Sequence, residues 1–406
     1  MSDQSLVGID DIDLYASTQS VDFADIAAAR GFTAKDLRAI RFHRRSVLPV
    51  FEDPVTLAVN AARGIVEDAG PEAFGLLIVA TESGLDFGKS LSTYVHRYLG
   101  LGPHCRNFEV KHACFGGTAA LLMAASWVRE SPSKRRALVV MTDVARNHFG
   151  ELTELTGGAG AVALSVSAAP RVLALDPHTG SATKEVWDVA RPTPAFEWGD
   201  PVLSLYAYLD LLELAWGEYR RVSGAPKLEE AFAHVLYHAP LVSLVERAHR
   251  ELLDGDGSDT DAASSFATMV EPTLRLNAEL GNIYSGSLYA SLVGLLEARQ
   301  DATAGMRLGC FSYGSGACAE FFSGRIRAPA AGLVARRGVG PRLAARRKLT
   351  VAEYEAASHA LHDALAAEDL VPDPTAAAEL WESAYAGRGL LVLEQVRRYH
   401  RVYRRS

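Results

Sequence analysis

Cysteine is scarce in this chain, and its few occurrences exclude two kinds of architecture. The 406 residues include four cysteines, and no two of them form a C-x-x-C pair. Four thiols are too few for a disulfide framework at this length. The histidines show neither an H-E-x-x-H motif nor a cluster with cysteine, so no metal site is expected. We predict that Cys105, Cys310 and Cys318 are reduced and mostly buried.

Long apolar runs and an excess of positive charge are also missing. The longest apolar stretches, such as 76–80 and 137–141, have the length of a strand and cannot span a bilayer. The first residues, MSDQSLVGIDDIDL, are acidic and lack the apolar core of a secretion signal. A net charge of −8 disfavours nucleic acid and anionic membranes as partners. These features predict a soluble, cytoplasmic protein.

The chain does carry alternating strand and helix patterns, which are typical of an α/β protein. Two glycine motifs, Gly158–Ala161 and Gly314–Ala317, share a G-x-G-A pattern at the start of an apolar strand, a weak internal repeat. Strands are expected at 74–80, 137–142, 157–166, 232–237, 307–313 and 314–323. Helices are expected at 54–68, 89–98, 203–220, 240–253, from after Asn282 to about 297, and in the tail near 351–366 and 390–403.

The stretch FEVKHACFGGTAALLMAASWV, residues 108–128, is the most informative in the chain. A strand pattern ends at His112, Cys114 follows at a turn, and Gly116 and Gly117 precede an apolar helix. The positive end of a helix dipole favours a thiolate, the reactive form of cysteine. Paired glycines let a substrate carbonyl approach bare backbone N–H groups. The pattern predicts a thiol that accepts an acyl group.

Three further polar residues lie where strands or helices are expected to begin or end. Glu82 follows the strand at 74–80, His238 closes the strand at 232–237, and Asn282 precedes a buried helix. Ligands of α/β sheets bind at the carboxyl ends of strands, so these side chains can converge on Cys114. Each also has a structural alternative: Glu82 as a helix cap or surface carboxylate, His238 as a core histidine, and Asn282 as an N-cap.

Taken together, these segments resemble the 3-hydroxy-3-methylglutaryl (HMG) synthases of the thiolase superfamily. The motifs ATESG, ACFGGTAAL, YHAP, GNIYSGSLY and GCFSYGSGA occur in the family's order between about residues 51 and 324. The resemblance implies a five-layered αβαβα fold built from two similar halves, and a homodimer. We expect a first half at 1–170 with Glu82 and Cys114, a second at 171–330 with His238 and Asn282, and a helical extension at 331–406.

Within the family, the chain looks most like the synthases that install β-branches on carrier-bound polyketides. The segments FEDPVTLAVNAA, ESGLDFGKSLSTYVHRYLGL and ERAHR carry this resemblance. Ser243 stands where the enzymes of the mevalonate pathway have a lysine, so a contact for a coenzyme A phosphate is lost. Three alternatives stay open: the mevalonate enzyme itself, a ketoacyl synthase III-type enzyme, and an inactive relative that docks carrier proteins.

The resemblance also implies a role for each matching residue. Cys114 is the nucleophile that takes an acetyl group, Glu82 the general base and acid, and His238 the group that holds the acceptor carbonyl and stabilises charge. The remaining matches are supporting residues near the substrate: Asn282, Ser312 as an oxyanion donor through its backbone, Asp143 and Asp200. Either aspartate can instead cap a helix or loop.

The partners implied are a donor and an acceptor acyl carrier protein. No bound cofactor is expected, because the phosphopantetheine arm of the carrier presents the substrate. Carrier proteins are acidic, so an enzyme of net charge −8 needs a local basic patch. Three groups of arginines are candidates, each with a partner-free alternative: Arg41, Arg44 and Arg45; Arg336 and Arg337; Arg346 and Arg347.

Overall fold

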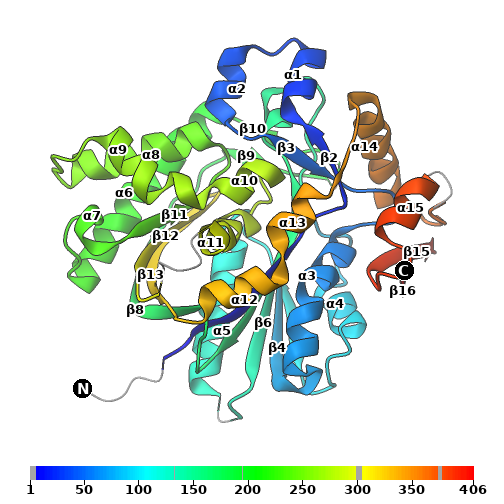
Figure 1. Cartoon of the computed structure of the whole chain (residues 1–406), viewed down its shortest axis with the longest axis horizontal. Coiled ribbons are helices and arrows are strands. Elements are labelled where there is room, and N and C mark those ends of the chain that lie inside the picture. The colour runs from blue at the N-terminus through cyan, green and yellow to red at the C-terminus, as the bar shows by residue number, and fades with distance from the viewer. Residues whose placement is uncertain (1–5, 132, 194, 299–303, 374–376) are drawn as a thin grey trace.

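The computed structural model describes residues 6–131, 133–193, 195–298, 304–373 and 377–406. Nine strands form one continuous sheet in the order β11-β12-β13-β8-β1-β7-β6-β4-β5 (Figure 1). The strands of the sheet are β1 Gly8–Tyr15, β4 Phe74–Ala80, β5 Arg106–Val110, β6 Arg136–Val144, β7 Ala159–Ser167, β8 Leu173–Thr183, β11 His234–Tyr237, β12 Arg307–Gly314 and β13 Cys318–Ile326. The short strands are β2 Gln19–Asp22, β3 Arg44–Val47, β9 Val189–Ala190, β10 Trp198–Gly199, β14 Arg347–Lys348, β15 Leu391–Arg397 and β16 His400–Arg405.

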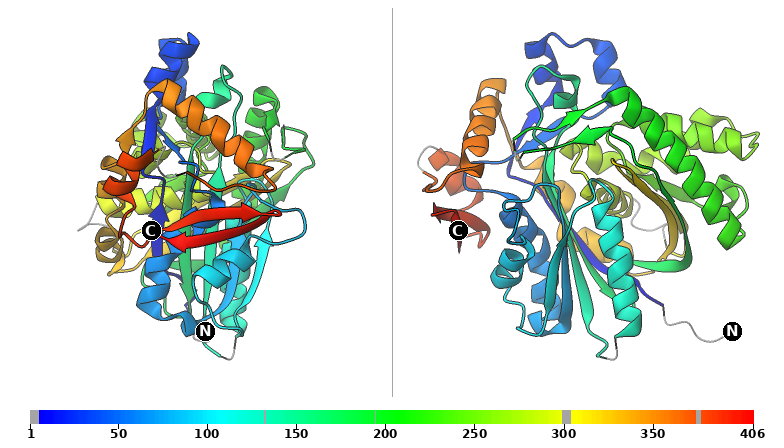
Figure 2. Two further views of the ribbon diagram at one scale, coloured as in Figure 1. Left: turned by 90° about the vertical axis from the view of Figure 1, so that its right-hand side faces the viewer. Right: turned by 180° about the vertical axis from the view of Figure 1, so that it is seen from behind.

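Fifteen α-helices are found in the described residues, and most cover the faces of this sheet (Figure 2). They are α1 Phe23–Arg30, α2 Ala34–Ile40, α3 Pro54–Ala69, α4 Ser92–Tyr98, α5 Gly116–Glu130, α6 Pro201–Ser223, α7 Leu228–Ala231, α8 Val242–Gly255, α9 Ala262–Met269, α10 Arg275–Leu280, α11 Gly286–Ala298, α12 Ala330–Arg337, α13 Val339–Ala344, α14 Val351–Leu365 and α15 Ala378–Ala384.

The sheet narrows between β1 and β8, which share only the pairs Gly8↔Ala174 and Ile9↔Leu173. An added Cβ at Gly8 would lie 2.0 Å from the carbonyl oxygen of Leu173, so only glycine permits this approach. The narrow junction divides the sheet into two halves, and α5 and α11 share one core with the strands of both. The two halves therefore enclose a central helical layer.

Each half of the sheet buries its other face under different helices. Ile78 of β4 faces α5 and α11, whereas its neighbour Leu77 packs with α3. Cys310 of β12 likewise faces the central layer, and Phe311 packs with α6 and α8. This alternation follows from the two-residue period of a strand. The layers are helix, sheet, helix, sheet and helix, in the order that we expected.

Most expected elements are present, with ends within a few residues of the predicted positions. The start of α3 shows why its position could be predicted. The Asp53 side chain accepts hydrogen bonds from the N–H groups of Val55 and Thr56, and the Asp53 N–H donates to the Thr56 hydroxyl. Pro54 occupies the first turn of the helix.

The helix predicted at 390–403 is wrong, because this segment is the hairpin β15–β16. Leu391 and Leu393 pack into the core beside α3, while Val392 faces the opposite side, next to Phe51. Two contacts hold the hairpin to α3: Asn60 exchanges hydrogen bonds with the backbone of Leu391, and Asp53 binds Arg401 and Tyr403. Alternating burial and these tertiary contacts override the helical pattern of the sequence.

Candidate active site

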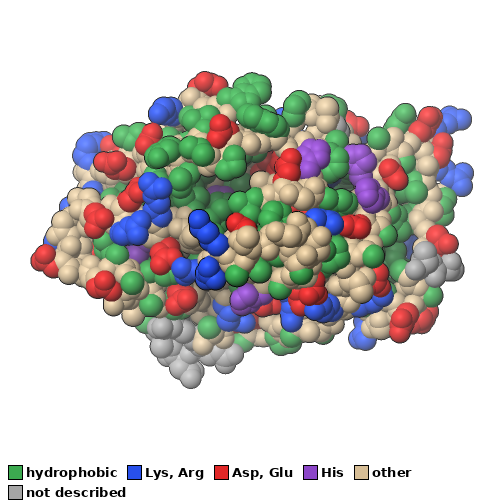
Figure 3. Space-filling model, turned by 90° about the horizontal axis from the view of Figure 1, so that it is seen from above, with side chains coloured by type: hydrophobic (Ala, Val, Ile, Leu, Met, Phe, Trp, Pro, Cys, Tyr) green, Lys and Arg blue, Asp and Glu red, His purple; other side chains and the backbone are tan. Residues whose placement is uncertain are grey.

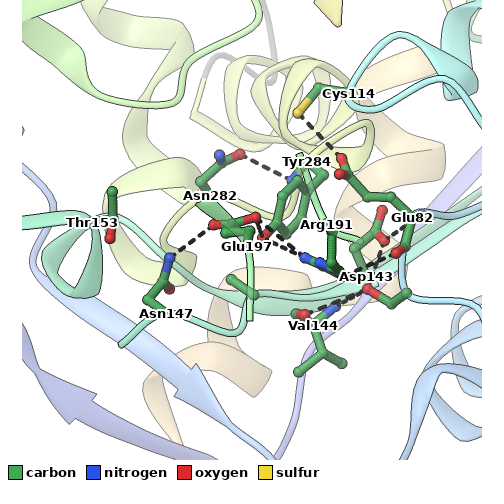
Figure 4. A network of polar contacts seen from close by, with 12 residues as sticks. Glu82, Cys114, Asp143, Val144, Asn147, Thr153, Arg191, Glu197, Asn282 and Tyr284 are labelled. Atoms are coloured by element: carbon green, nitrogen blue, oxygen red, sulfur yellow. Dashed lines mark hydrogen bonds and ion pairs between the residues drawn. The ribbon is translucent and has the colours of Figure 1, made fainter. Parts of the chain in front are cut away.

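Cys114 and Glu82 meet at the carboxyl ends of the strands in the first half of the sheet. Glu82 follows β4, and Cys114 lies in the turn that leads from β5 into α5. The distance from Cys114 Sγ to Glu82 Oε1 is 3.6 Å (Figure 4). Sulfur and carboxylate are thus within reach of a common small substrate, as the sequence predicted.

Asp143, near the end of β6, fixes the segment that carries Glu82. Its Oδ1 accepts hydrogen bonds from the Glu82 N–H at 2.9 Å, the Ser83 hydroxyl at 2.9 Å and the Thr81 hydroxyl at 3.2 Å. Burial and the charge of Asp143 raise the pKa of Glu82, and burial raises the pKa of Asp143. A carboxyl with a raised pKa is better matched to abstracting a carbon-bound proton.

The thiol of Cys114 behaves differently from the expectation based on the helix dipole. Burial raises its pKa well above the usual range, and the charges of Glu82, Asp143 and Glu197 act in the same direction. The thiol is therefore neutral at rest. Its proton has an acceptor in Glu82, whose carboxylate is its hydrogen-bond partner.

The turn that carries Cys114 is held in an uncommon backbone conformation. Ala113 has a φ of 39°. The Ser285 hydroxyl donates to the Ala113 carbonyl at 3.2 Å and accepts from the Gly117 N–H at 3.1 Å. One serine thus joins the turn to the first residues of α5, and it comes from the same loop as Asn282. The structure brings the GNIYSG segment against the cysteine turn.

His238 is buried at the carboxyl end of β11. Its N–H donates to the Phe311 carbonyl at 2.8 Å, and its carbonyl accepts from the Tyr208 hydroxyl at 2.7 Å. Burial lowers the pKa of His238 to about 3, so the imidazole is neutral at physiological pH. Its Nδ1 has no hydrogen-bond partner among the residues that the structure describes. A neutral imidazole can polarise a carbonyl by donating a hydrogen bond.

The second half of the sheet reaches the cysteine turn through β12, the neighbour of β11. An added Cβ at Gly314 would lie 2.6 Å from the Phe115 nitrogen and 2.7 Å from the His112 carbonyl oxygen. Ser312 lies two residues before this contact, buried, and pairs with Glu320 of β13. The ends of β11 and β12 therefore adjoin the Cys114 turn.

Asn282 and Asp200 have clear structural contacts. The Asn282 Oδ1 accepts from the Tyr284 N–H at 2.9 Å and from the Ser287 hydroxyl at 3.0 Å, which shapes the loop before α11. Figure 4 shows this side chain with its contact to the Tyr284 backbone. Asp200 instead caps α6, with Oδ1 accepting from the N–H groups of residues 202 and 203 at 3.0 Å. These contacts are those of a helix cap, which was one of the two alternatives that the sequence allowed for Asp200.

Sequence reasoning missed four residues that complete the polar network (Figure 4). Arg191 contacts the Glu82 carbonyl at 2.9 Å, the Tyr284 hydroxyl at 3.1 Å and Glu197 at 3.3 Å. Glu197 also accepts from Tyr284 at 2.8 Å and from Asn147 at 2.9 Å. Arg191 and Glu197 lie in a segment where no motif or spacing pattern marks function. Within the described ranges, no group of three or more His, Cys, Asp or Glu side chains is placed to hold a metal ion.

A half-buried thiol paired with a carboxylate, beside a central helix layer between two sheet halves, is typical of a condensing enzyme of thiolase-like fold. Family models support a closer assignment. The "Hydroxymethylglutaryl-coenzyme A synthase N terminal" model matches residues 4–170, and the "C terminal" model of the same family matches residues 257–405. The chain belongs to the hydroxymethylglutaryl-coenzyme A synthase family, whose members form C–C bonds by acyl transfer.

Individual relatives agree with this assignment. The polyketide biosynthesis 3-hydroxy-3-methylglutaryl-ACP synthase PksG of Bacillus subtilis is 37% identical, with 86% of this chain and 87% of the relative covered. The hydroxymethylglutaryl-CoA synthase of Enterococcus faecalis is 34% identical, with 86% and 91% covered. The crystal structure of the HMG synthase of the curacin biosynthetic pathway superposes with a TM-score of 0.94 at 34% identity, covering 99% and 100% of the two chains. That synthase has also been crystallised with holo and acetyl donor-ACP.

Proposed function

We propose that the chain is an HMG synthase of polyketide biosynthesis that adds an acetyl-derived branch to the β-ketone of a carrier-bound chain. The observation that carries this proposal is the 3.6 Å contact between the Cys114 thiol and the Glu82 carboxylate. A thiol alone suffices for acyl transfer, whereas a carboxylate beside it adds a base for the acyl methyl group. The likeness to PksG and to the curacin synthase supports the polyketide setting.

In the first step, Cys114 attacks the acetyl thioester of a donor carrier protein. The thiol proton passes to Glu82 and the bond between sulfur and the carbonyl carbon forms. Glu82 then returns this proton to the departing thiol of the phosphopantetheine arm, so that its carboxylate is free again. The backbone N–H of Cys114 and that of Ser312 are proposed to stabilise the oxyanion. In the second step, the Glu82 carboxylate removes a proton from the acetyl methyl group, which generates an enolate.

The enolate carbon then attacks the β-ketone of the acceptor chain. We assign to His238 the hydrogen bond that polarises this carbonyl, with Asn282 assisting, and the new alkoxide takes its proton from protonated Glu82. Asp143 holds Glu82 in place, and Asp200 supports the neighbouring α6. Water finally cleaves the thioester at Cys114, which releases the branched product on the acceptor carrier. The phosphopantetheine arm is the only cofactor that this scheme needs.

Ser243 supports a protein-borne donor over coenzyme A. It is the second residue of α8, a half-buried position on the surface of the second half. A serine hydroxyl does not supply the positive charge that a nucleotide phosphate attracts. The mevalonate-pathway reaction with acetyl-CoA and acetoacetyl-CoA is the nearest alternative. A ketoacyl synthase III-type reaction is a further one, and the Glu82 carboxylate argues against it.

The arginines that the sequence singled out for carrier docking differ in accessibility. Arg45 and Arg346 are buried and the Arg337 side chain is only 9% exposed, so these three offer little surface to a docking partner. Arg41 keeps 43% of its side chain exposed and pairs with Glu246 of α8. Arg44, Arg336 and Arg347 are also accessible, each in ion pairs.

An apolar patch adjoins the start of α6 and supports docking on the same side of the molecule. Trp198, Val202 and Tyr206 are each more than half exposed, and Arg247 of α8 lies over the Tyr206 ring. Figure 3 shows a hollowed face with hydrophobic side chains on one side and Lys or Arg side chains on the other. Exposed apolar patches rimmed by charge mark protein interaction sites. We assign the carrier-docking surface to this patch together with Arg41 and Arg247.

The compartment and the oligomeric state belong to the same proposal. The structure contains no helix, within its described residues, that is long and apolar enough to cross a membrane. All four cysteines are free thiols, which suits a reducing, cytoplasmic setting. We further propose a homodimer that forms through the uncovered edge strand β5, Arg106–Val110.

Acetylation of Cys114 tests this function directly. The enzyme is mixed with acetyl-carrier protein or with acetyl-CoA, and the acetyl adduct is followed by intact-protein mass. We expect faster loading from the carrier, slower loading in Arg41→Glu because a docking charge is reversed, and unchanged loading in the control Arg129→Glu at the far end of α5. Ser243→Lys is expected to speed loading from acetyl-CoA about 5-fold, since an exposed ion pair contributes about 1 kcal/mol.

Rapid loading by acetyl-CoA with none by any acetyl-carrier protein would show that the mevalonate-type reaction is the correct one. Failure of Cys114 to load from either donor would instead favour a docking protein without activity. The Cys114→Ser variant provides the unlabelled baseline in each case.

A further inference from the structure

The polar network beside Cys114 includes an ion pair at the end of a small ribbon. Strands β9 and β10 pair through Ala190↔Trp198 and Val189↔Gly199. Arg191 directly follows the first strand and Glu197 directly precedes the second, so the two side chains leave the same end of the ribbon. Their charged groups lie 3.3 Å apart, with only 11% and 16% of the side chains exposed.

Arg191 reaches from this ribbon to the main chain of the proposed base. Its Nη1 donates to the Glu82 carbonyl oxygen at 2.9 Å, and the Glu82 N–H donates to Asp143 at the same distance. Both polar main-chain groups of Glu82 are therefore held by charged side chains from other segments. The carboxylate lies beyond these two contacts, and its Oε1 accepts a hydrogen bond from the Cys114 thiol at 3.6 Å.

The guanidinium is itself held from the opposite side. Its Nη2 donates to the Tyr284 hydroxyl at 3.1 Å, and that hydroxyl donates to Glu197 at 2.8 Å. Asn147 donates to the second oxygen of Glu197 at 2.9 Å. An arginine side chain that several partners already fix in place loses little conformational entropy when it binds a further group. Arg191 can therefore hold the Glu82 main chain rigidly.

We propose that Arg191 is a positioning residue for the proton-transfer step, which aims the Glu82 carboxylate at the methyl group of the acetyl-enzyme through the Glu82 main chain. This inference rests on the proposed role of Glu82 as the base. Arg191 does not contact the substrate in this scheme. Glu197 is the counter-charge that keeps Arg191 in place.

The charges around Glu82 make the two members of this ion pair act in opposite directions. The groups that face Glu82 are Cys114, Asp143, Arg191, Glu197 and Tyr284. Among them, Arg191 lowers the pKa of Glu82, whereas Asp143 and Glu197 raise it. Loss of the Arg191 charge must therefore move the titration of Glu82 to higher pH, and loss of the Glu197 charge must move it to lower pH.

Hydrogen–deuterium exchange at the acetyl methyl group isolates this step. Cys114 is loaded with acetyl, from acetyl-CoA or a carrier, and the acetyl-enzyme is held in D2O without acceptor. The Glu82 carboxylate removes a methyl proton, exchanges it with solvent and returns a deuteron to the enolate carbon. The deuterium content of the acetyl group is read by mass spectrometry across a series of pH values.

For Arg191→Met we expect exchange to slow by about 10- to 100-fold at neutral pH, because a misplaced group costs about that much, with the profile shifted to higher pH. Arg191→Lys keeps the positive charge but loses the planar guanidinium with its several donors. The pH dependence of exchange should therefore stay near that of the wild type, with a lower maximal rate. Glu197→Gln should shift the profile to lower pH. Arg307→Met, which removes another half-buried arginine paired with Asp176, is the matched control and should exchange at the wild-type rate.

Wild-type exchange rates and profiles in Arg191→Met would overturn the proposal, as would shifts of the same sign in Arg191→Met and Glu197→Gln. Thermal unfolding and the extent of Cys114 acetylation show whether each variant is folded. If Arg191→Met does not fold, Arg191→Lys and Glu197→Gln carry the test. Glu82→Gln separates this inference from the proposed function. Undiminished exchange in that variant would show that Glu82 is not the base. If exchange is lost in Glu82→Gln, the base is confirmed and the Arg191 variants alone decide the positioning role.

Discussion

At the scale of single residues, burial assigns different protonation states to the proposed base and to the imidazole. Burial raises the pKa of Glu82 and lowers the pKa of His238 to about 3. A carboxyl that must be ionised to accept a proton gains activity as the pH rises through its raised pKa. The histidine, already neutral above its low pKa, adds no titration step near neutral pH.

We therefore predict that condensation increases with pH through neutrality and that His238→Gln leaves this acid limb in place. The variant should reduce kcat by about 100- to 1000-fold, the usual cost of losing one hydrogen bond to a developing oxyanion. The measurement is kcat against pH for wild type and variant, with acetyl loading of Cys114 as the control for folding. An acid limb that disappears in His238→Gln would identify the histidine as the titrating group.

The sequence could predict that Cys114 and Glu82 lie close together, because each follows a strand pattern within a motif. It could not predict Arg191 and Glu197, because they lie in a segment without periodicity and become neighbours only through the pairing of β9 with β10. The expectation that the helix dipole favours a Cys114 thiolate also differs from the structure, in which the pKa of the thiol is raised. The charge around Cys114 comes from carboxylates that are distant in sequence.

At the scale of elements, the end of β12 and the turn before α5 are packed so closely that a glycine is required. We predict that Gly314→Ala slows acetylation of Cys114 by at least about 10-fold and lowers the free energy of unfolding by about 1–3 kcal/mol, because the new Cβ meets the backbone of His112 and Phe115. The measurements are intact-protein mass against time and urea unfolding.

The matched control is Gly217→Ala in the middle of α6, where an added Cβ meets no atom within 4 Å. There alanine should raise the free energy of unfolding by about 1 kcal/mol through helix propensity, with acetylation unchanged. If Gly314→Ala loads at the wild-type rate, the contact between β12 and the cysteine turn does not position the thiol.

Strand β1 shows why some elements escaped prediction. Its sequence, GIDDIDLY, was interpreted only as an acidic segment, yet every residue of the strand is buried at the centre of the sheet. The aspartates are tolerated because arginines from distant segments bind them: Asp10 binds Arg136 and Arg171, and Asp13 binds Arg342. Buried charges need such partners, and the sequence gives no sign of which arginines supply them.

At the scale of the whole molecule, the two edges of the sheet differ in how well they are covered. All four residues of β11 are buried, and α9 contacts the strand. At the opposite edge, β4 is the only partner of β5 among the strands of the described residues, and no residue of β5 is fully buried. An uncovered edge strand offers a row of backbone groups for pairing with another chain.

Two large exposed apolar side chains belong to segments that contact β5. Phe87 is 93% exposed, in a loop whose neighbouring residue Leu91 donates its N–H to Glu109 of β5. Met123 of α5, the helix that follows β5, is 44% exposed. Together with the free backbone groups of β5, these side chains give the edge both the hydrogen-bonding and the apolar character of a symmetric interface.

We predict that the combined variant Phe87→Glu and Met123→Glu is monomeric, whereas the wild type sediments as a dimer in analytical ultracentrifugation. Two carboxylates in a desolvated symmetric contact meet their own copies, and like charges there cost several kcal/mol. Leu214→Glu, which replaces a leucine on α6 that is 59% exposed, is the control and should remain dimeric. A wild type that is monomeric at micromolar concentration, or a double variant that stays dimeric, would show that β5 is not the interface.

Because Cys114 follows β5 within a few residues, loss of the dimer should also slow acetyl loading, which couples the oligomeric state to the chemistry of the site.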